Sequence, residues 1–414
     1  MREVTQPARA RGTMLSAVAV VAALTALLAF APFASATSDP VASGTTSVTL
    51  NKGLYKKLKK YGIKVLKVSP GKVNKRKITL PVASGSMDPT NGLGSLELSG
   101  GFKFKAGKKQ APVKALILDT AQSKLTGKVA NKKMKIATVS GLTYARNGFG
   151  VNVSVAKMKL TGNAAKQLNK KLGFTGKKKG KPPFKGGQVL GGSFSETQPK
   201  TVAVIPTGTA KLVLAPSALK KLKHVGTPPF PEGSSPVEVV LSPVAPTTFD
   251  VPTLTAGFPI SGGTIGPTAQ AGTLQTAGGL QLVQNLEPVT GKPGDKTTLV
   301  MGNIWLDLAA KTASVEVTIT NPVTTKANLG NLGRSSIADI SLVGATVTSD
   351  PVARTVSVQN ASAALQAVTA ATLNQVFIEG LEKNEKGEPT PFAGQEKFAA
   401  GDPLGLVSFT AQTQ

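Results

Sequence analysis

Residues 80–102 read LPVASGSMDPTNGLGSLELSGGF, and residues 258–280 read FPISGGTIGPTAQAGTLQTAGGL. Each stretch carries short apolar segments on both sides of a Gly- and Pro-rich turn, a pattern typical of two antiparallel strands. At a shift of 178 positions the stretches share residues that set turns and packing, namely Pro81, Gly85, Pro89, Gly94, Leu96, Gly100 and Gly101 with Pro259, Gly263, Pro267, Gly272, Leu274, Gly278 and Gly279. The pair predicts one β domain present in two copies.

The repeat continues on both sides of these stretches. TSVTLNKGLYKKLKKYG (46–62) aligns with AKLVLAPSALKKLKHVG (210–226) at a shift of 164. Later matches are Leu118-Asp119 with Leu306-Asp307 at 188, Leu168-Asn169 with Leu373-Asn374 at 205, and Phe184 with Phe398 at 214. Because the shift only grows along the chain, the second copy has gained loop insertions. We place the copies at residues 44–199 and 208–414.

Short strands between turns dominate each copy. The 44 Gly and 28 Pro of the 414-residue chain indicate many turns, and mean hydropathy of +0.04 indicates a folded protein. One helix is predicted over 53–61, where Leu54, Leu58 and Tyr61 share a face, and a second begins after Thr161. The predicted fold class is mostly β, with two tandem homologous β-sandwich-like domains that each carry one or two short peripheral helices.

The N-terminus has the pattern of an export signal. Arg2, Arg9 and Arg11 precede an uncharged apolar run over 14–33, and Ala34-Ser35-Ala36 is a small-residue cleavage pattern. Residues 1–36 are therefore predicted to be a signal peptide, followed by a spacer over 37–43, which makes the protein secreted and extracellular. An uncleaved membrane anchor is the alternative, because the run is long enough to span a bilayer.

No motif in the chain predicts an enzyme. Without Cys there is no disulfide, thiolate metal site or Cys nucleophile. The single His, His224, lies in a Lys-rich helical segment, where a surface role is expected. Asp119 and Asp307 recur at matched strand ends, where we expect them to cap turns. Trp305 is expected in the core. We predict no catalytic residues and no metal site.

Positive charge is concentrated in the first copy. Residues 51–200 hold 33 Lys and Arg against four acids, whereas residues 201–414 hold 13 against 15. Such a field attracts polyanions, here anionic cell-envelope polymers, while the scarcity of aromatics argues against specific nucleic-acid recognition. The alternative is a solvated surface that aids solubility. The candidate polyanion contacts are Lys56, Lys57, Lys59, Lys60, Lys177, Lys178, Lys179 and Lys181.

The strings PVASGSMDPTNGLGSLELSGGFKF (81–104) and LILDTAQSKLTGKV (116–129) resemble the HtaA-like domain of secreted and surface actinobacterial proteins, as do the closing strings at 184–194 and 398–409. The resemblance implies a β-rich domain that binds haem through a Tyr near its start and a His further on. Tyr55 and Tyr61 could stand for that Tyr. The His would fall near Lys105 to Lys109, where neither copy has one. A non-enzymatic binding or structural protein is therefore our reading, with haem or porphyrin binding as the alternative.

Overall fold

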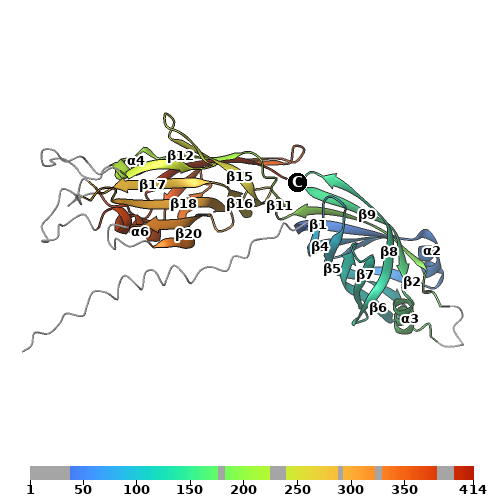
Figure 1. The fold of residues 1–414 in the computed structure, drawn as a ribbon. Coiled ribbons are helices and arrows are strands. Elements are labelled where there is room, and N and C mark those ends of the chain that lie inside the picture. Colours follow the sequence, from blue (N-terminus) through green and yellow to red (C-terminus); the bar gives the residue numbers. More distant parts are fainter. Residues whose placement is uncertain (1–37, 176–181, 224–238, 288–291, 322–328, 380–395) are drawn as a thin grey trace, which may run out of the picture.

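The computed structural model describes residues 38–175, 182–223, 239–287, 292–321, 329–379 and 396–414. The predicted signal peptide, His224 and the lysines at 177–181 lie outside these ranges. The described chain forms two antiparallel sheets that lie end to end (Figure 1).

The first sheet closes into a ring. Its strands are β1 (Asp39–Leu50), β2 (Ile63–Val68), β3 (Lys72–Asn74), β4 (Lys77–Met87), β5 (Gly94–Ala106), β6 (Lys109–Asp119), β7 (Lys124–Val129), β8 (Lys132–Asn147), β9 (Gly150–Leu160) and β10 (Val189–Pro199). Neighbouring strands pair in the order β5-β6-β7-β8-β9-β10-β1-β4, and β4 pairs back onto β5. Ring closure leaves these strands without a free edge. β2 and β3 extend from β5 and β4.

The second sheet repeats this order. Its strands are β11 (Val202–Ala203), β12 (Thr209–Leu214), β13 (Val239–Val244), β14 (Thr248–Asp250), β15 (Thr255–Ile265), β16 (Gly272–Thr276), β17 (Gly279–Asn285), β18 (Lys296–Asp307), β19 (Thr312–Thr320), β20 (Gly330–Ser341), β21 (Thr346–Asp350), β22 (Thr355–Leu365) and β23 (Pro403–Gln412). The ring runs β16-β18-β19-β20-β22-β23-β12-β15 and closes through β15 and β16. β16 and β17 together correspond to β5, interrupted at Gly278.

Short helices lie at the outer end of each domain (Figure 1). They are α2 (Lys52–Lys60) and α3 (Gly162–Leu172) in the first domain, and α4 (Pro216–Lys223) and α6 (Ala367–Phe377) in the second. The Asn51 side chain caps α2 and the Thr161 side chain caps α3. α3 packs against β5 to β8 with Ala164, Ala165, Leu168 and Leu172 buried.

The two eight-stranded rings pair their strands in the same order, which confirms the predicted fold class. β1 pairs with β10 and β4, just as β12 pairs with β23 and β15. Even a strand irregularity recurs: Ala115 in β6 and Asn303 in β18 have φ of 50° and 49°, at positions 188 apart. Each ring encloses its own apolar core, so the shared Gly, Pro and apolar residues set shape in both copies.

Candidate polyanion-binding surface

Three lysines lie side by side across the outer face of the first domain. Lys114 of β6 pairs directly with Lys128 of β7, and Lys128 pairs directly with Lys133 of β8. All three side chains are exposed. Val113 and Val129, next to them along the strands, point inward and are buried, since successive residues of a strand face opposite sides. We call Lys114, Lys128 and Lys133 the lysine row.

The lysine row is unfavourable for the isolated domain. Strands lie about 4.8 Å apart, so each ammonium group has a like charge as its direct cross-strand neighbour. Such pairs are destabilising, by about 0.2–1 kcal/mol each. None of the ion pairs in the described ranges involves a member of the row. A bound anion would relieve this repulsion.

At the corresponding positions the second domain holds one cation and one acid. Gly302 of β18 pairs with Glu316 of β19, and Glu316 pairs with Arg334 of β20. Arg334 Nη2 lies 3.2 Å from Glu316 Oε1. The guanidinium also stacks on the Trp305 ring, 3.8 Å from its centroid. An acid therefore stands in the second domain where the first has Lys128.

The stacking on Arg334 corrects the expectation for Trp305. The side chain is half-buried on the outer face of the sheet and is not part of the core. Strand alternation is the reason: Leu306, the next residue, is the one that points inward and is buried.

The predicted lysines of α2 border a second positively charged area. Lys56, Lys59 and Lys60 are exposed, and Lys57 is half-buried. Lys57 Nζ donates to the Pro182 carbonyl at 3.4 Å. Burial and the nearby charge of Lys185 lower the pKa of Lys57. The Lys57 amine thus lies near a neutral carbonyl, that of Pro182, and a positive charge, that of Lys185.

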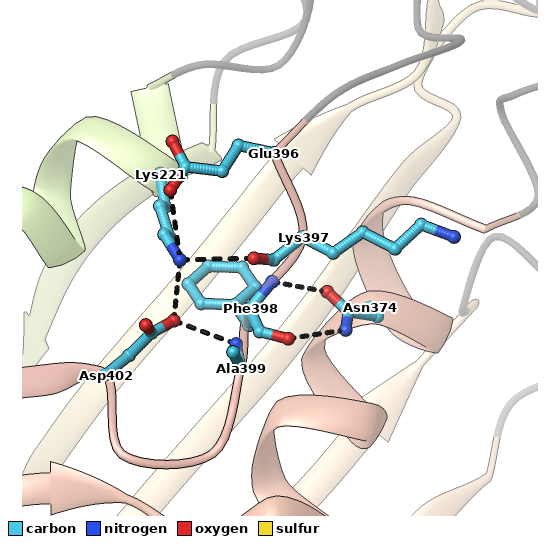
Figure 2. A network of polar contacts seen from close by, with 7 residues as sticks. All are labelled: Lys221, Asn374, Glu396, Lys397, Phe398, Ala399 and Asp402. Atoms are coloured by element: carbon cyan, nitrogen blue, oxygen red, sulfur yellow. Dashed lines mark hydrogen bonds and ion pairs between the residues drawn. The ribbon is translucent and has the colours of Figure 1, made fainter.

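The matching amine of the second domain is surrounded by carboxylates (Figure 2). Lys221, which lies 164 positions after Lys57, contacts Asp402 at 2.7 Å and Glu396 at 3.2 Å. It also donates to the Lys397 carbonyl at 3.1 Å. Burial alone would lower the pKa of Lys221, but the hydrogen bonds to Asp402 and Glu396 raise it.

One substitution explains much of this difference. Asp402 Oδ2 accepts a hydrogen bond from the Ala399 amide at 2.8 Å, and in the first domain Gln188 Oε1 accepts one from the Lys185 amide at 3.1 Å. The two side chains therefore accept equivalent hydrogen bonds from the backbone of their loops. Gln188 does so without a negative charge, and none of the ion pairs in the described part of the chain involves Lys57.

The loop beside this amine is anchored identically in both domains. Asn374 Nδ2 donates to the Phe398 carbonyl at 2.9 Å, and Asn374 Oδ1 accepts from the Phe398 amide at 2.8 Å. Asn169 makes the same pair of bonds to Phe184, at 2.8 and 3.2 Å. The loops beside Lys57 and Lys221 therefore share the same backbone anchor.

The two candidate haem tyrosines have packing roles. The Tyr61 ring is half-buried and lies edge-on to Phe174, with 5.7 Å between centroids. Tyr55 is half-buried, and Lys59 Nζ lies 5.1 Å from its ring centroid. The structure does bring the helix end near the turn after β5, because Ile63 pairs with Ala106. That turn carries Lys108 and Lys109.

The recurring acids cap turns, as predicted. Asp119 Oδ1 accepts a hydrogen bond from the Gln122 amide at 2.8 Å. Asp307 Oδ1 accepts from the Ala309 and Ala310 amides at 2.9 and 2.8 Å. Within the described ranges, no three His, Cys, Asp or Glu side chains gather in a way that could hold a metal ion. No helix in these ranges has the length and apolar character needed to cross a membrane.

Sequence reasoning found the lysines of α2 but missed the lysine row. Its members are separated by 14 and 5 positions, and no local periodicity joins them. The repeat contained a usable signal, because the shift of 188 that aligns Asp119 with Asp307 also aligns Lys128 with Glu316.

No protein-family model and no curated protein sequence matches the chain. Three solved structures from Corynebacterium glutamicum resemble it. The C-terminal domain of HtaA is 14% identical, with 39% of this chain and 99% of that chain covered and a TM-score of 0.30. The heme binding protein HtaB is 14% identical, with 52% and 95% covered and a TM-score of 0.30. The N-terminal domain of HtaA is 13% identical, with 50% and 98% covered and a TM-score of 0.30. At these values the likenesses assign neither function nor ligand.

Proposed function

We propose that the chain is a non-enzymatic secreted or cell-surface binding protein whose first domain contacts anionic polymers of the cell envelope. The predicted signal peptide over 1–36 supports a location outside the cell. The observation that carries the proposal is the register position shared by Lys128 and Glu316. The second domain pairs Arg334 with Glu316, whereas no ion pair in the described ranges involves Lys114, Lys128 or Lys133.

The contrast favours a binding surface over a surface that only aids solubility. Solubility requires net charge but no alignment of like charges on neighbouring strands. The lysine row concentrates three cations within about 10 Å, given a strand spacing of about 4.8 Å. A linear polymer with closely spaced phosphates or carboxylates can contact all three ammonium groups at once. In the described ranges Lys57 forms no ion pair, whereas its counterpart Lys221 contacts Asp402 and Glu396.

The test is sedimentation of the chain with isolated cell walls, followed over a range of salt concentrations. We expect retention at low salt and release as the Debye length shrinks from about 10 Å at 0.1 M to about 3 Å at 1 M. Lys128→Glu copies the residue of the second domain into the first, and we expect it to weaken retention at least tenfold.

Two variants with the same change in charge serve as controls. Lys166→Glu lies on the exposed side of α3, off the row, and Lys211→Glu lies on β12 of the second domain. We expect the loss of retention to decrease in the order Lys128, Lys166, Lys211. Equal losses of retention in all three variants would show that net charge alone causes binding, and would reject the lysine row as the contact surface. Salt-independent retention of the unaltered chain would reject the proposed function itself.

A further inference from the structure

One aromatic side chain of the first domain packs into the core of the second. Phe149, in the turn between β8 and β9 of the first domain, is 6% exposed and belongs to the apolar core of the second domain. It packs there in a cluster with Val202, Val204 and Ile265. Across the junction, the Arg146 side chain of the first domain also donates to the main-chain oxygen of Gln414 in the second. Phe149 therefore joins the end of the first domain to the core of the second.

A cleft of about 650 Å³ opens beside this junction. The first domain contributes the β8–β9 turn and Gln198 of β10, and the second contributes the turn between β21 and β22. The lining residues are Arg146, Asn147, Gly148, Phe149, Gln198, Pro351, Val352 and Arg354. This volume would admit a small organic molecule, and the cleft is open toward solvent rather than enclosed.

Two arginines, one from each domain, face this cleft. Arg146 donates hydrogen bonds to the Phe149 carbonyl, at 3.2 Å, and to the main-chain oxygen of Gln414, the last residue of the sequence. The backbone of Arg354 is held by Thr413, whose amide and hydroxyl both donate to the Arg354 carbonyl at 2.9 Å. Gln414 thus anchors the Arg146 side chain, and Thr413 anchors the backbone of Arg354.

No acidic side chain lines the cleft beside the two guanidinium groups. They repel each other, and the charge of Arg354 is one cause, after burial, that lowers the pKa of Arg146. Asp39 and Asp88 attract Arg146, but in the described ranges neither forms an ion pair with it. Asp88 instead accepts hydrogen bonds from Thr90 and Asn91 within its own turn.

We propose that this interdomain cleft binds a small organic anion whose carboxylate or phosphate lies between Arg146 and Arg354. Guanidinium groups present paired donors that match the oxygens of such an anion. Phe149, Pro351 and the 92% exposed Val352 supply apolar contacts for the body of the ligand, and the Asn147 and Gln198 amides supply polar ones. The site is separate from the lysine row and does not depend on polymer binding.

The experiment is calorimetric titration of the full chain with three probes at matched ionic strength. Phenyl phosphate and benzoate combine an anion with an apolar body, and inorganic phosphate provides the anion alone. We expect one molecule of phenyl phosphate or benzoate to bind per chain, and the stronger of the two identifies the preferred oxyanion. Inorganic phosphate should bind at least tenfold more weakly.

Variants of Arg354 then locate the site. Arg354→Gln should weaken binding at least tenfold, and Arg354→Lys, which keeps the charge but loses the paired donors, should weaken it less. Lys296→Gln, with the same loss of charge at an exposed position of β18, and Lys128→Glu should both bind like the unaltered chain. Thermal unfolding of each variant confirms that it is folded. The proposal is overturned if Arg354→Gln binds as well as Lys296→Gln, or if neither organic probe binds.

Discussion

Lys128 and Glu316 occupy the same register position on equivalent strands of the two domains, and their charges are opposite. Around Glu316 the neighbouring cation is neutralised by a contact of 3.2 Å to Arg334. Around Lys128 both cross-strand neighbours are further lysines. The first domain therefore keeps a repulsion that its own fold, as the second domain demonstrates, can remove.

Lys128→Glu should stabilise the first domain. The substitution replaces two like-charge cross-strand pairs with two attractive ones, and we expect a gain of about 0.5–1 kcal/mol in the free energy of unfolding at low salt. Urea unfolding at low and high ionic strength measures the gain, which should shrink as salt is added. Lys166→Glu, off the row, should give a smaller change. A loss of stability in Lys128→Glu would contradict the account of the row.

Asn374→Ala should destabilise the second domain by about 2–3 kcal/mol. The change removes two buried hydrogen bonds and leaves the amide and carbonyl of Phe398 without partners. Asn169→Ala should cost a similar amount in the first domain, where the same bonds hold Phe184. Urea unfolding measures both. Asn163→Ala, at an exposed position of α3, is the control and should cost nothing.

Phe149→Ala should loosen the contact between the domains. The ring is 6% exposed in the apolar core of the second domain, and its removal should cost about 3 kcal/mol. Phe194→Ala removes the same side chain from a position that is 41% exposed and should cost under about 1 kcal/mol. Chemical unfolding gives the stabilities, and small-angle scattering should show a broader distribution of shapes only for Phe149→Ala.

Asp39 should make stability fall as pH rises. Burial raises the pKa of its carboxyl from 3.8 to about 6, although Arg146 and the Ala203 amide pull it down. One carboxylate oxygen is buried without a hydrogen bond. The folded state therefore holds the proton more tightly than the unfolded state, so the contribution is full below about pH 4 and is lost as pH passes about 6.

Asp39→Asn should remove this pH dependence. At neutral pH it should raise the free energy of unfolding by about 1–2 kcal/mol, because the buried charge and its solvation cost are gone. Thermal unfolding at about pH 5 and about pH 7.5 measures the effect. Glu196→Gln, which removes a carboxylate from an exposed position, should leave the pH dependence of the unaltered chain in place.

Haemin should give no absorbance change that depends on the tyrosines. The Tyr61 ring packs on Phe174, Tyr55 lies beneath Lys59, and the turn after β5 offers lysines where the resemblance places a histidine. The measurement is a haemin titration of the chain and of its Tyr55→Phe and Tyr61→Phe variants. A Soret band that shifts in the unaltered chain and reverts in either variant would support haem binding instead.

The sequence by itself determined the two-copy architecture, the strand-rich fold and the concentration of charge in the first copy. Gly and Pro mark the turns, and apolar residues mark the core, so these features survive in a linear pattern. Asp119 and Asp307 could be recognised as turn caps for the same reason, since capping acts over two or three residues.

Only the tertiary structure decided which charges meet. Lys114, Lys128 and Lys133 align because of the register of three strands, and a slip of one residue would turn Lys128 inward. Trp305 was placed wrongly for a related reason, because its aromatic character indicated the core while strand alternation turned it toward Arg334. The cleft between Arg146 and Arg354 depends on how Phe149 joins the domains. Contacts between distant segments depend on how the strands and domains pack, and this packing produces no repeating pattern of residues in the sequence.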